Sequence, residues 1–351
     1  MAESTHLDWQ DGQPVSRRFG DVYFSRASGI EETRHVFLHH NHLEERWRAL
    51  PPGAQFVIGE TGFGTGLNFL CAWQLWNECA PDATLHYVTI EKYPLSADEL
   101  TQALSLWTQL SPWRDALLAQ YRDLPPGWHR FVFDGRVTLT IAVGDIADVM
   151  PQLDMQADAW FLDGFAPTRN PEMWSANILN AIARHSHPGS TFATYTAAGK
   201  VRRSLQAAGF AVERVKGHGV KREMLRGTLQ QSSTPIREAV WYRRPSAPHA
   251  NHRAIVIGGG LAGTSAAASL AARGWHVTLI ERHATLAAEA SGNPQGILYT
   301  RLATQPTALR SLVVSGYCHT LRLLRRGLLS DHDWQLCGLL QLAFDENEAA
   351  R

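Results

Sequence analysis

The sequence predicts an α/β protein: a Rossmann-like, mainly parallel sheet, followed by the first βαβ unit of a second sheet. Three observations predict this fold class. Short apolar runs alternate with helical patterns from Gln55 onward, glycine-rich loops follow two of these runs, and a segment of linker composition lies between the two loops. At roughly 150 residues per domain, the 351 residues are enough for about two domains.

Composition and charge narrow the class of protein. Hydrophobic residues make up 44% of the chain and charged residues 19%, which is typical of a globular protein and excludes disorder, collagen and coiled coil. The 33 basic and 33 acidic residues cancel, so no global positive field attracts nucleic acid. An RNA partner would have to bind a local basic patch.

The cysteines and the N-terminus predict the compartment. Cys71, Cys79, Cys318 and Cys337 form no CxxC pair and are too scattered for a disulfide framework or a zinc site. The N-terminus has no basic segment followed by an apolar one, and no run of 18 apolar residues occurs. We therefore expect a cytoplasmic protein with no membrane segment.

Five apolar runs of the first region are each typical of a buried strand: AQFVIGE, LHYVTIEK, VTLTIAVGD, DAWFLDG and STFATYT. Helices between them predict a parallel sheet covered on both faces, whose ligands bind outside the carboxyl ends of the strands. EAVWYRR is one further candidate strand, and PSAPHANHR has linker composition. We place the boundary near Pro245, which gives domains over 1–245 and 246–351.

A first glycine loop, GETGFGTG, connects the first strand to a helix. Gly62, Gly64 and Gly66 allow a tight turn with positive φ and a close approach of the backbone to a ligand. Glu60 precedes them, and a carboxylate there would repel a pyrophosphate but suits a cationic cofactor with an amino-acid tail. The loop therefore favours S-adenosylmethionine, which has a sulfonium and an ammonium group, over an NAD-type dinucleotide.

Two further acids follow the next strands. Glu91 lies 25 residues past Gly66, where a carboxylate can accept hydrogen bonds from ribose hydroxyls, and Asp145 follows the third strand, where an adenine amino group would bind. Three acids at three successive strand ends predict a class I methyltransferase sheet. The alternative is that they are helix N-caps or solvated turn residues.

The fourth strand leads into the loop Asp163-Gly-Phe-Ala-Pro167, where an amine could be held. Methyl transfer from a sulfonium needs a neutral nucleophile in line with the S–CH3 bond, and Asp163 can orient an amine and accept its proton. Because a nearby carboxylate also raises the pKa of an amine, we favour positioning over proton removal. Asp163 capping its own turn is the alternative. Tyr195 is a candidate either for this pocket or for the core.

A basic stretch with few acids follows, and its members are Lys200, Arg202, Arg203, Arg214, Lys216, Lys221, Arg222 and Arg226. Contact with RNA phosphates is the functional interpretation, and a solvated helix face explains the same charges equally well. The histidines His35, His39, His40 and His42 lie close together in the sequence. No carboxylate or cysteine stands at ligand spacing from them, so we expect no metal site.

A second glycine loop, in AIVIGGGLAG, opens the region after the linker. Gly258, Gly260 and Gly263 form a GxGxxG fingerprint directly after a strand, and the next strand ends in Glu281, 18 residues past Gly263. A pyrophosphate would lie at the helix N-terminus and Glu281 would bind ribose hydroxyls. No acid precedes the first glycine, so the loop predicts FAD or NAD and not S-adenosylmethionine.

Together these motifs resemble one protein family. GETGFGTGLNFL, FLDGFAPTRNPEMW, TYTAAGKVRRSLQAAGF and KREML, followed by IVIGGGLAGTSAAASL and ASGNPQGILY, are similar to the bacterial bifunctional MnmC enzymes of 5-methylaminomethyl-2-thiouridine biosynthesis. The resemblance covers nearly the whole chain. It implies an N-terminal domain that uses S-adenosylmethionine to methylate the amine of 5-aminomethyl-2-thiouridine at the tRNA wobble position.

The resemblance also implies an FAD-dependent domain that removes the carboxymethyl group from 5-carboxymethylaminomethyl-2-thiouridine. Members of the family have a much longer flavin domain, so 246–351 is expected to form its N-terminal part. Carried over by position, the S-adenosylmethionine contacts are Glu60, Gly62, Gly64, Gly66, Glu91 and Asp145, and Asp163 is the catalytic-site acid. The FAD contacts are Gly258, Gly260, Gly263, Glu281, Ser291 and Asn293. The contacts to the tRNA anticodon arm are Lys200, Arg202, Arg203, Lys221 and Arg222.

Two other functions fit part of the same pattern. A small-molecule amine methyltransferase would use the glycine loop and Asp163, and salt-insensitive activity on a free amine nucleoside would favour it. A non-catalytic tRNA-binding scaffold would have a degenerate glycine loop, and failure of S-adenosylmethionine to bind would favour that function. We expect a monomer.

Overall fold

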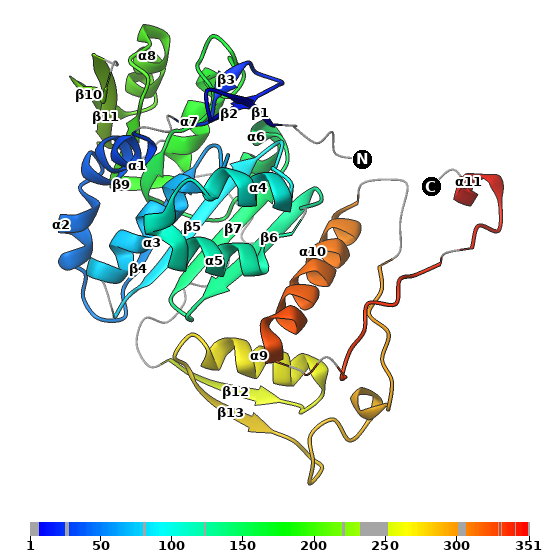
Figure 1. Cartoon of the computed structure of the whole chain (residues 1–351). Helices are drawn as coiled ribbons and strands as arrows, with labels where there is room; N and C mark the ends of the chain where they lie inside the picture. The colour runs from blue at the N-terminus through cyan, green and yellow to red at the C-terminus, as the bar shows by residue number, and fades with distance from the viewer. Residues whose placement is uncertain are drawn as a thin grey trace. The chain divides into compact units, whose positions relative to one another are not determined.

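The computed structural model describes residues 7–24, 28–79, 82–122, 124–219, 222–231, 252–300, 307–328, 330, 332–340 and 342–349. The chain divides into two compact units (Figure 1). The first combines residues 1–132, 137–235 and 302–351, and the second combines 133–136 and 236–301. The candidate strand EAVWYRR and the boundary near Pro245 lie outside the described residues, so the domain division stays a prediction.

An eight-stranded sheet in the order β10-β11-β9-β8-β4-β5-β7-β6 forms the centre of the first unit. Its strands are β4 (Gln55–Glu60), β5 (Thr84–Glu91), β6 (Gly127–Phe133), β7 (Val137–Val143), β8 (Ala157–Phe161), β9 (Ser186–Thr194), β10 (Phe210–Lys216) and β11 (Glu223–Leu229). The five predicted strands are β4, β5, β7, β8 and β9, and they pair in parallel. This confirms the predicted α/β sheet. The antiparallel pair β10 and β11 extends it beside β9.

Helices pack on this sheet in two groups. Their bounds are α1 (Gly29–Thr33), the π-helix η1 (Arg34–His39), α2 (Leu43–Arg48), α3 (Leu67–Cys79), α4 (Ala97–Leu104), η2 (Thr108–Leu110), α5 (Ser111–Gln120), α6 (Ile146–Val149), η3 (Met150–Gln152), α7 (Ala176–Arg184) and α8 (Gly199–Ala207). The helices α1, α2 and α5 each contact α3, and α6, η3, α7 and α8 form a second group. Figure 1 shows α3 and α5 in front of the sheet. Burial on both faces explains the nearly continuous apolar runs of the central strands.

The order of the strands places a crevice at the carboxyl end of β4. β4 lies between β5 and β8, so the chain builds the sheet first toward β5 and β7 and later toward β8 and β9. Ligands of open α/β sheets bind at such a switch point. Glu60 and Glu91 end β4 and β5, while Asp145 and Asp163 stand two residues past β7 and β8. The predicted acids therefore lie at one edge of the sheet.

The N-terminal segment forms a small antiparallel sheet that the sequence analysis did not predict. It consists of β1 (Leu7–Gln10), β2 (Gln13–Ser16) and β3 (Asp21–Val22), in the order β1-β2-β3. The first unit also contains α10 (Ala308–Leu323), the π-helix η6 (Leu324–Leu328) and α11 (Glu346–Ala349). Among the described residues, no helix is long and apolar enough to cross a membrane.

The second unit contains the predicted βαβ element. β12 (Arg253–Ile257) and β13 (His276–Ile280) pair in parallel, and α9 (Leu261–Ala271) connects them. The 3-10 turn η5 (Ala290–Gly292) follows. Gly263 lets the helix approach the strand, because a Cβ there would lie 1.8 Å from the Gly258 carbonyl oxygen. This close contact is what the third glycine of the fingerprint provides.

Candidate active site

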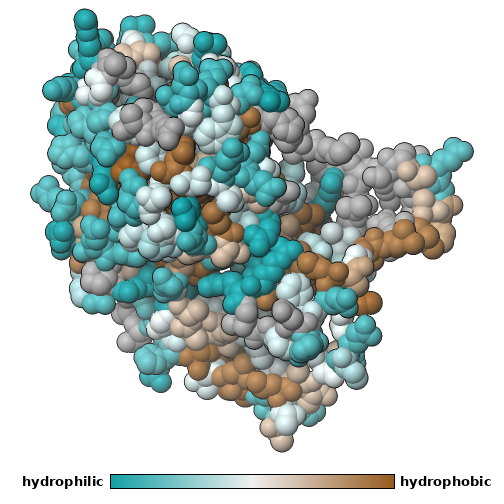
Figure 2. All heavy atoms as spheres, viewed as in Figure 1, coloured by the Kyte–Doolittle hydropathy of each residue, from teal (hydrophilic) through white to brown (hydrophobic). Residues whose placement is uncertain are grey.

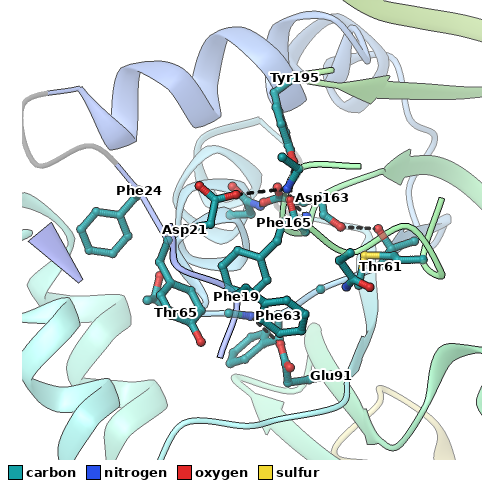
Figure 3. A pocket seen from close by; sticks show the side chains of 18 of the residues that line it. Phe19, Asp21, Phe24, Thr61, Phe63, Thr65, Glu91, Asp163, Phe165 and Tyr195 are labelled. Carbon is teal, nitrogen blue, oxygen red and sulfur yellow. Dashed lines mark hydrogen bonds between the residues drawn. The ribbon is translucent and has the colours of Figure 1, made fainter. Parts of the chain in front are cut away.

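A cavity of about 820 Å³ opens at the carboxyl ends of the central strands of the first unit (Figure 3). Among the predicted residues, Gly62, Gly64, Glu91, Asp145 and Asp163 line it, and so does Tyr195, the candidate for either the pocket or the core. The volume lies in the range of small-molecule sites. The structure therefore brings the glycine loop and three of the four predicted acids to one cavity.

The glycine loop makes its turn with two left-handed residues. Gly64 has φ +52° and Gly66 has φ +73°, and a Cβ at Gly66 would lie 2.7 Å from Cζ of Phe63. The prediction of positive φ is confirmed for these two glycines. It is wrong for Gly62, whose φ is not positive. A Cβ at Gly62 would meet the protein only at ordinary contact distance, 3.5 Å from the Asp163 carbonyl oxygen. Its own backbone geometry therefore tolerates a side chain.

Glu91 joins the glycine loop to the end of β5. Its Oε2 accepts a hydrogen bond from the Gly64 N–H at 2.9 Å, and its Oε1 accepts one from the Tyr93 N–H at 2.8 Å. Burial raises the pKa of this carboxyl group, and the backbone hydrogen bonds oppose the rise. Each carboxylate oxygen has a second lone pair, so Glu91 can still accept hydrogen bonds from hydroxyl groups of a ligand.

Asp145 caps a helix and forms an ion pair. Its Oδ1 accepts a hydrogen bond from the Ala147 N–H at 2.9 Å, as the N-cap residue of α6. Its Oδ2 lies 2.6 Å from Nζ of Lys92, and this contact lowers the pKa of Asp145. The N-cap interpretation therefore describes the geometry of Asp145, which also lines the cavity.

Asn68, on the first turns of α3, connects two acids. Its Nδ2 donates hydrogen bonds to Glu60 Oε1 at 3.0 Å and to Asp163 Oδ2 at 2.6 Å. Its Oδ1 accepts a hydrogen bond from Thr33 Oγ1 at 2.8 Å, which fixes the orientation of the amide. Asn68 lines the cavity, whereas Glu60 is 1% exposed and is not among the lining residues.

Glu60 is consequently a buried acid behind the cavity wall. Burial, with the nearby charge of Asp163 as a second cause, raises its pKa from 4.5 to about 8. At neutral pH the carboxyl group is mostly protonated. The sequence analysis predicted a direct cofactor contact for Glu60, but the structure places Asn68 between this acid and the cavity.

The loop that carries Asp163 is fixed by several elements. Asp163 Oδ1 accepts a hydrogen bond from the Gly164 N–H at 2.8 Å, and the Asp163 carbonyl accepts one from Thr61 Oγ1 at 2.6 Å. Tyr195, at the end of β9, donates its hydroxyl to the Gly164 carbonyl at 2.6 Å. Burial raises the pKa of Tyr195, so the hydroxyl stays a donor. Asp163 therefore caps its own turn and also presents a fixed carboxylate to the cavity.

The N-terminal segment contributes residues that the sequence analysis missed. Arg18, Phe19, Asp21 and Tyr23 line the same cavity. Asp21 Oδ2 accepts a hydrogen bond at 3.2 Å from the N–H of Ala166, which belongs to the same loop as Asp163. This segment lies outside the α/β alternation and has no glycine loop or spaced acids. The sequence therefore offered no signal for these four residues.

The basic stretch is partly neutralised within its own hairpin. Arg226 lies 2.9 Å from Glu213 and Arg214 lies 3.4 Å from Glu223. Among the predicted tRNA contacts, Lys200, Arg203 and Arg222 are exposed, Arg202 is half-buried, and Lys221 lies outside the described residues. His218 and Gly219, in the turn after β10, line the cavity, so this turn brings the basic hairpin to the site.

The four histidines of the sequence cluster lie close together in space. The rings of His35 and His40 are 4.9 Å apart and those of His39 and His40 are 5.0 Å apart. Burial lowers the pKa of His40 to about 4. Within the part of the chain that the structure describes, no group of three or more His, Cys, Asp or Glu is placed to hold a metal ion.

A second cavity, of about 420 Å³, lies in the second unit at the ends of β12 and β13. Gly258, Gly260, Glu281 and Ser291 line it, whereas Gly263 and Asn293 do not. Glu281 Oε2 accepts a hydrogen bond from the Gly259 N–H at 2.6 Å, and Ser291 Oγ accepts one from the Leu261 N–H at 3.1 Å. A glycine turn, a helix N-terminus and an acid at the next strand end suit the ribose and pyrophosphate of a dinucleotide.

The fold and the two cavities are typical of a methyltransferase sheet followed by a dinucleotide-binding unit, and two family matches agree with this. Residues 108–230 match the family described as S-adenosyl-L-methionine-dependent methyltransferase. Residues 253–351 match the family described as FAD dependent oxidoreductase. The chain therefore combines a region of an S-adenosylmethionine-dependent methyltransferase with a region of an FAD-dependent oxidoreductase.

Whole-chain comparisons give the particular family. The chain is 58% identical over its full length to the tRNA 5-methylaminomethyl-2-thiouridine biosynthesis bifunctional protein MnmC of Ectopseudomonas mendocina. It is also 58% identical, over 98% of its length, to the MnmC protein of Chromobacterium violaceum. The chain belongs to this MnmC family, and it spans about half the length of these relatives, 53% of each.

One solved structure shows the same fold. It is MnmC2 from Aquifex aeolicus, with a TM-score of 0.54 and 24% sequence identity. The similarity covers 67% of this chain and 74% of that chain.

Proposed function

We propose that the first unit methylates the primary amine of 5-aminomethyl-2-thiouridine at the wobble position of tRNA, with S-adenosylmethionine as methyl donor. The observation that carries the proposal is Asp163, whose carboxylate is held in a fixed orientation at the wall of the cavity at the sheet's switch point. The names of the relatives, which are 58% identical, support the choice of tRNA and of this nucleoside.

The residues of the cavity fit S-adenosylmethionine. Glu91 retains lone pairs for the ribose hydroxyls, the positive-φ glycines bring backbone close to the ligand, and Asp145 stands at the strand end proposed for adenine. The acidic lining also suits a cofactor that carries a sulfonium and an ammonium group. When bound, S-adenosylmethionine supplies a methyl group that an amine can accept without a metal or a redox partner.

Asp163 would hold the amine of the substrate. Hydrogen bonds from the Gly164 N–H to Oδ1 and from Asn68 to Oδ2 fix the carboxylate at the cavity wall, where its charge attracts an amine and its oxygens can accept an amine N–H. Such contacts direct the nitrogen lone pair at the methyl carbon, which contributes to rate by orientation. The proton that the methylated amine loses can pass to the same carboxylate.

The remaining assignments are proposals of the same kind. Lys200, Arg202, Arg203, Lys221 and Arg222 would contact phosphates of the tRNA anticodon arm, near the turn that carries His218. Residues 246–351 would bind the nucleotide part of FAD through Gly258, Gly260, Gly263, Glu281, Ser291 and Asn293. We propose a domain boundary near residue 245 and a protein that works in the cytoplasm.

The proposal is tested by methylation of the defined nucleoside. The purified chain is incubated with S-adenosylmethionine and tRNA that carries 5-aminomethyl-2-thiouridine, and the digested tRNA is analysed by mass spectrometry. We expect the mass of one added methyl group on that nucleoside, and its loss in a folded Asp163→Asn variant. A folded parent chain that binds the cofactor and leaves the nucleoside unmethylated would show that the substrate is wrong.

A further inference from the structure

Three part-exposed aromatic rings gather at the wall of the cavity next to Asp163. The ring centroids of Phe19 and Phe165 are 4.5 Å apart, with an interplanar angle of 26°, and those of Tyr23 and Phe165 are 5.2 Å apart, with an angle of 72°. All three residues line the cavity, and none is fully buried. Figure 3 shows Phe165 and Phe19 with Asp163 in this cavity. Aromatic surface that stays open inside a cavity is available to a ligand.

The chemistry of the proposed substrate limits where its base can lie. In 5-aminomethyl-2-thiouridine a single methylene separates the amine from the pyrimidine ring. Two bonds of about 1.5 Å therefore place the ring within about 3 Å of the nitrogen. If Asp163 holds the amine, the ring must lie beside the loop of Asp163, in which Phe165 is the aromatic residue.

We propose that Phe165, Phe19 and Tyr23 form a stacking platform for the wobble pyrimidine, which would leave the anticodon stack to reach it. This inference rests on the proposed function. Unstacked RNA bases are commonly recognised on aromatic side chains, and a modifying enzyme must bring its target base out of the stack. The hydrogen bond from the Ala166 N–H to Asp21 connects the segment of Phe19 and Tyr23 to the loop of Phe165, so the platform is built from both.

The cofactor's adenine is expected at a different place. The acids assigned to ribose and adenine, Glu91 and Asp145, follow β5 and β7, whereas Phe165 follows β8. Phe19 lies between the two ends, because its ring centroid is also 6.1 Å from that of Tyr93, after β5. Phe165 is therefore the member of the platform whose substitution best separates base binding from cofactor binding.

The test uses the full chain with Phe165→Leu, Tyr23→Leu and the conservative Phe165→Tyr. Tyr299→Leu is the matched control, because Tyr299 is a 54% exposed tyrosine of the second unit that lines neither cavity. For each variant, kcat and KM are measured with tRNA carrying 5-aminomethyl-2-thiouridine at saturating S-adenosylmethionine. The Kd for S-adenosylmethionine is measured by calorimetry, and the melting temperature shows that the variant is folded.

We expect Phe165→Leu to lower kcat/KM for the tRNA by about 5-fold to 150-fold, since stacking of one base on an aromatic side chain contributes about 1–3 kcal/mol. Tyr23→Leu should lower kcat/KM less, because the ring of Tyr23 contacts Phe165 edge-on and supports the stacking surface from the side. Phe165→Tyr, which keeps the ring, and Tyr299→Leu should stay within about twofold of the parent. The Kd for S-adenosylmethionine should not change in any variant.

Three results would overturn the proposal. An unchanged kcat/KM in folded Phe165→Leu and Tyr23→Leu would show that no base stacks there. A parallel rise in the Kd for S-adenosylmethionine would assign the rings to the cofactor. A parent chain that leaves the tRNA nucleoside unmethylated but methylates another amine, in a reaction that depends on Asp163, would reject the tRNA substrate and the platform with it. If Phe165→Leu does not fold, the kcat/KM of Tyr23→Leu decides, and Phe165→Tyr serves as the folded variant that keeps an aromatic ring at position 165.

Discussion

Asn68 orients the carboxylate of Asp163. Both N–H groups of its side-chain amide are committed, one to Glu60 and one to Asp163, and Thr33 holds the amide oxygen. The hydrogen bond to Asp163 is the shorter, at 2.6 Å. Asn68 therefore sets the direction of the carboxylate without having to touch the amine itself.

We predict that Asn68→Ala lowers kcat for methyl transfer by roughly 10-fold to 100-fold, because a hydrogen bond to a charged group contributes about 1.5–3 kcal/mol. The Kd for S-adenosylmethionine, measured by calorimetry, should change less than kcat. Asn77→Ala is the matched control, because Asn77 is an exposed asparagine on the same helix, α3. Equal kcat values for the two variants would contradict the positioning role.

Glu60 makes stability depend on pH in a predictable direction. Its pKa is about 8 in the folded chain and 4.5 as its ordinary value, so between these values the folded state holds a proton that the unfolded state has lost. The contribution of Glu60 to the free energy of unfolding is therefore full below about pH 4.5. It decreases as pH rises toward 8, by at most about 1.4 kcal/mol per pH unit.

We predict that Glu60→Gln removes this decrease. The melting temperature of the variant relative to the parent should rise from pH 6 to pH 8.5, since glutamine stays neutral while Glu60 must ionise in a buried site. The control is Glu44→Gln, which replaces an exposed glutamate of α2. A constant difference between variant and parent across this pH range would show that Glu60 is not the group that titrates.

At the scale of residues, the acids of the site could be predicted from the sequence, but the residues that contact them could not. Glu91, Asp145 and Asp163 follow predicted strands, so topology alone places them at one edge. Asn68 has no such signal, because its partners are 8 and 95 residues away and meet it only in the folded chain. Phe19 belongs to a segment without any recognised motif, and its contact with Phe165 is equally non-local.

The turn between β4 and α3 depends on Gly66. Its φ of +73° is a left-handed conformation, and an added Cβ would lie 2.7 Å from the ring of Phe63, which is buried. Gly53 has nearly the same φ, +76°, but a Cβ there would have nothing within 4 Å. The two glycines therefore separate the cost of backbone conformation from the cost of a steric clash.

We predict that Gly66→Ala lowers the free energy of unfolding by about 2–4 kcal/mol. A left-handed alanine costs about 1 kcal/mol or more, and the clash with Phe63 adds to it. Gly53→Ala should lose about 1 kcal/mol, which is the conformational part alone. Urea unfolding of both variants measures the difference, and equal losses would show that the ring of Phe63 moves aside freely.

The exposed cations of α8 provide a test of the tRNA surface. Lys200 and Arg203 lie on this helix and are exposed. We predict that Lys200→Gln and Arg203→Gln each weaken tRNA binding and reduce the slope of log Kd against log salt by about one, as expected for the loss of one phosphate contact. Arg48→Gln, on α2, is the control for an exposed arginine outside the basic stretch. Unchanged salt slopes would indicate a solvated helix face.

At the scale of elements, apolar strands were predictable and polar strands were not. The central strands are buried on both faces, so their sequences are nearly continuous apolar runs. β10, with the sequence FAVERVK, is largely exposed, and its charged residues hide the strand pattern. The N-terminal strands β1 and β2 have only four residues each and carry Pro14 and several polar side chains, so they also lack a recognisable apolar run. These edge elements include the segment that contributes Phe19 and Tyr23 to the site.

The second unit has an apolar face that no described residue covers. Ile255 is 68% exposed, Ile257 is 84% exposed and Ile280 is 50% exposed, and the parallel register places Ile257 opposite Ile280. Figure 2 shows hydrophobic surface over this part of the chain. The residues between them in β12, Ala254 and Val256, are less exposed, because they alternate to the other face. Parallel sheets are normally covered on both faces, so this open face favours association.

We predict that the chain associates in a concentration-dependent manner and that Ile255→Thr with Ile257→Thr reduces this association. Threonine keeps the strand preference while it removes apolar surface from water. The measurements are sedimentation velocity at several concentrations and fluorescence of a dye that binds apolar surface. Methylation of tRNA should be unchanged, because both residues lie outside the first unit. Val256→Thr is the control, since it changes the opposite face of the same strand and should leave the association unchanged. An equal effect of both variants, or a parent chain that stays monomeric with no bound dye, would contradict the assignment of this face.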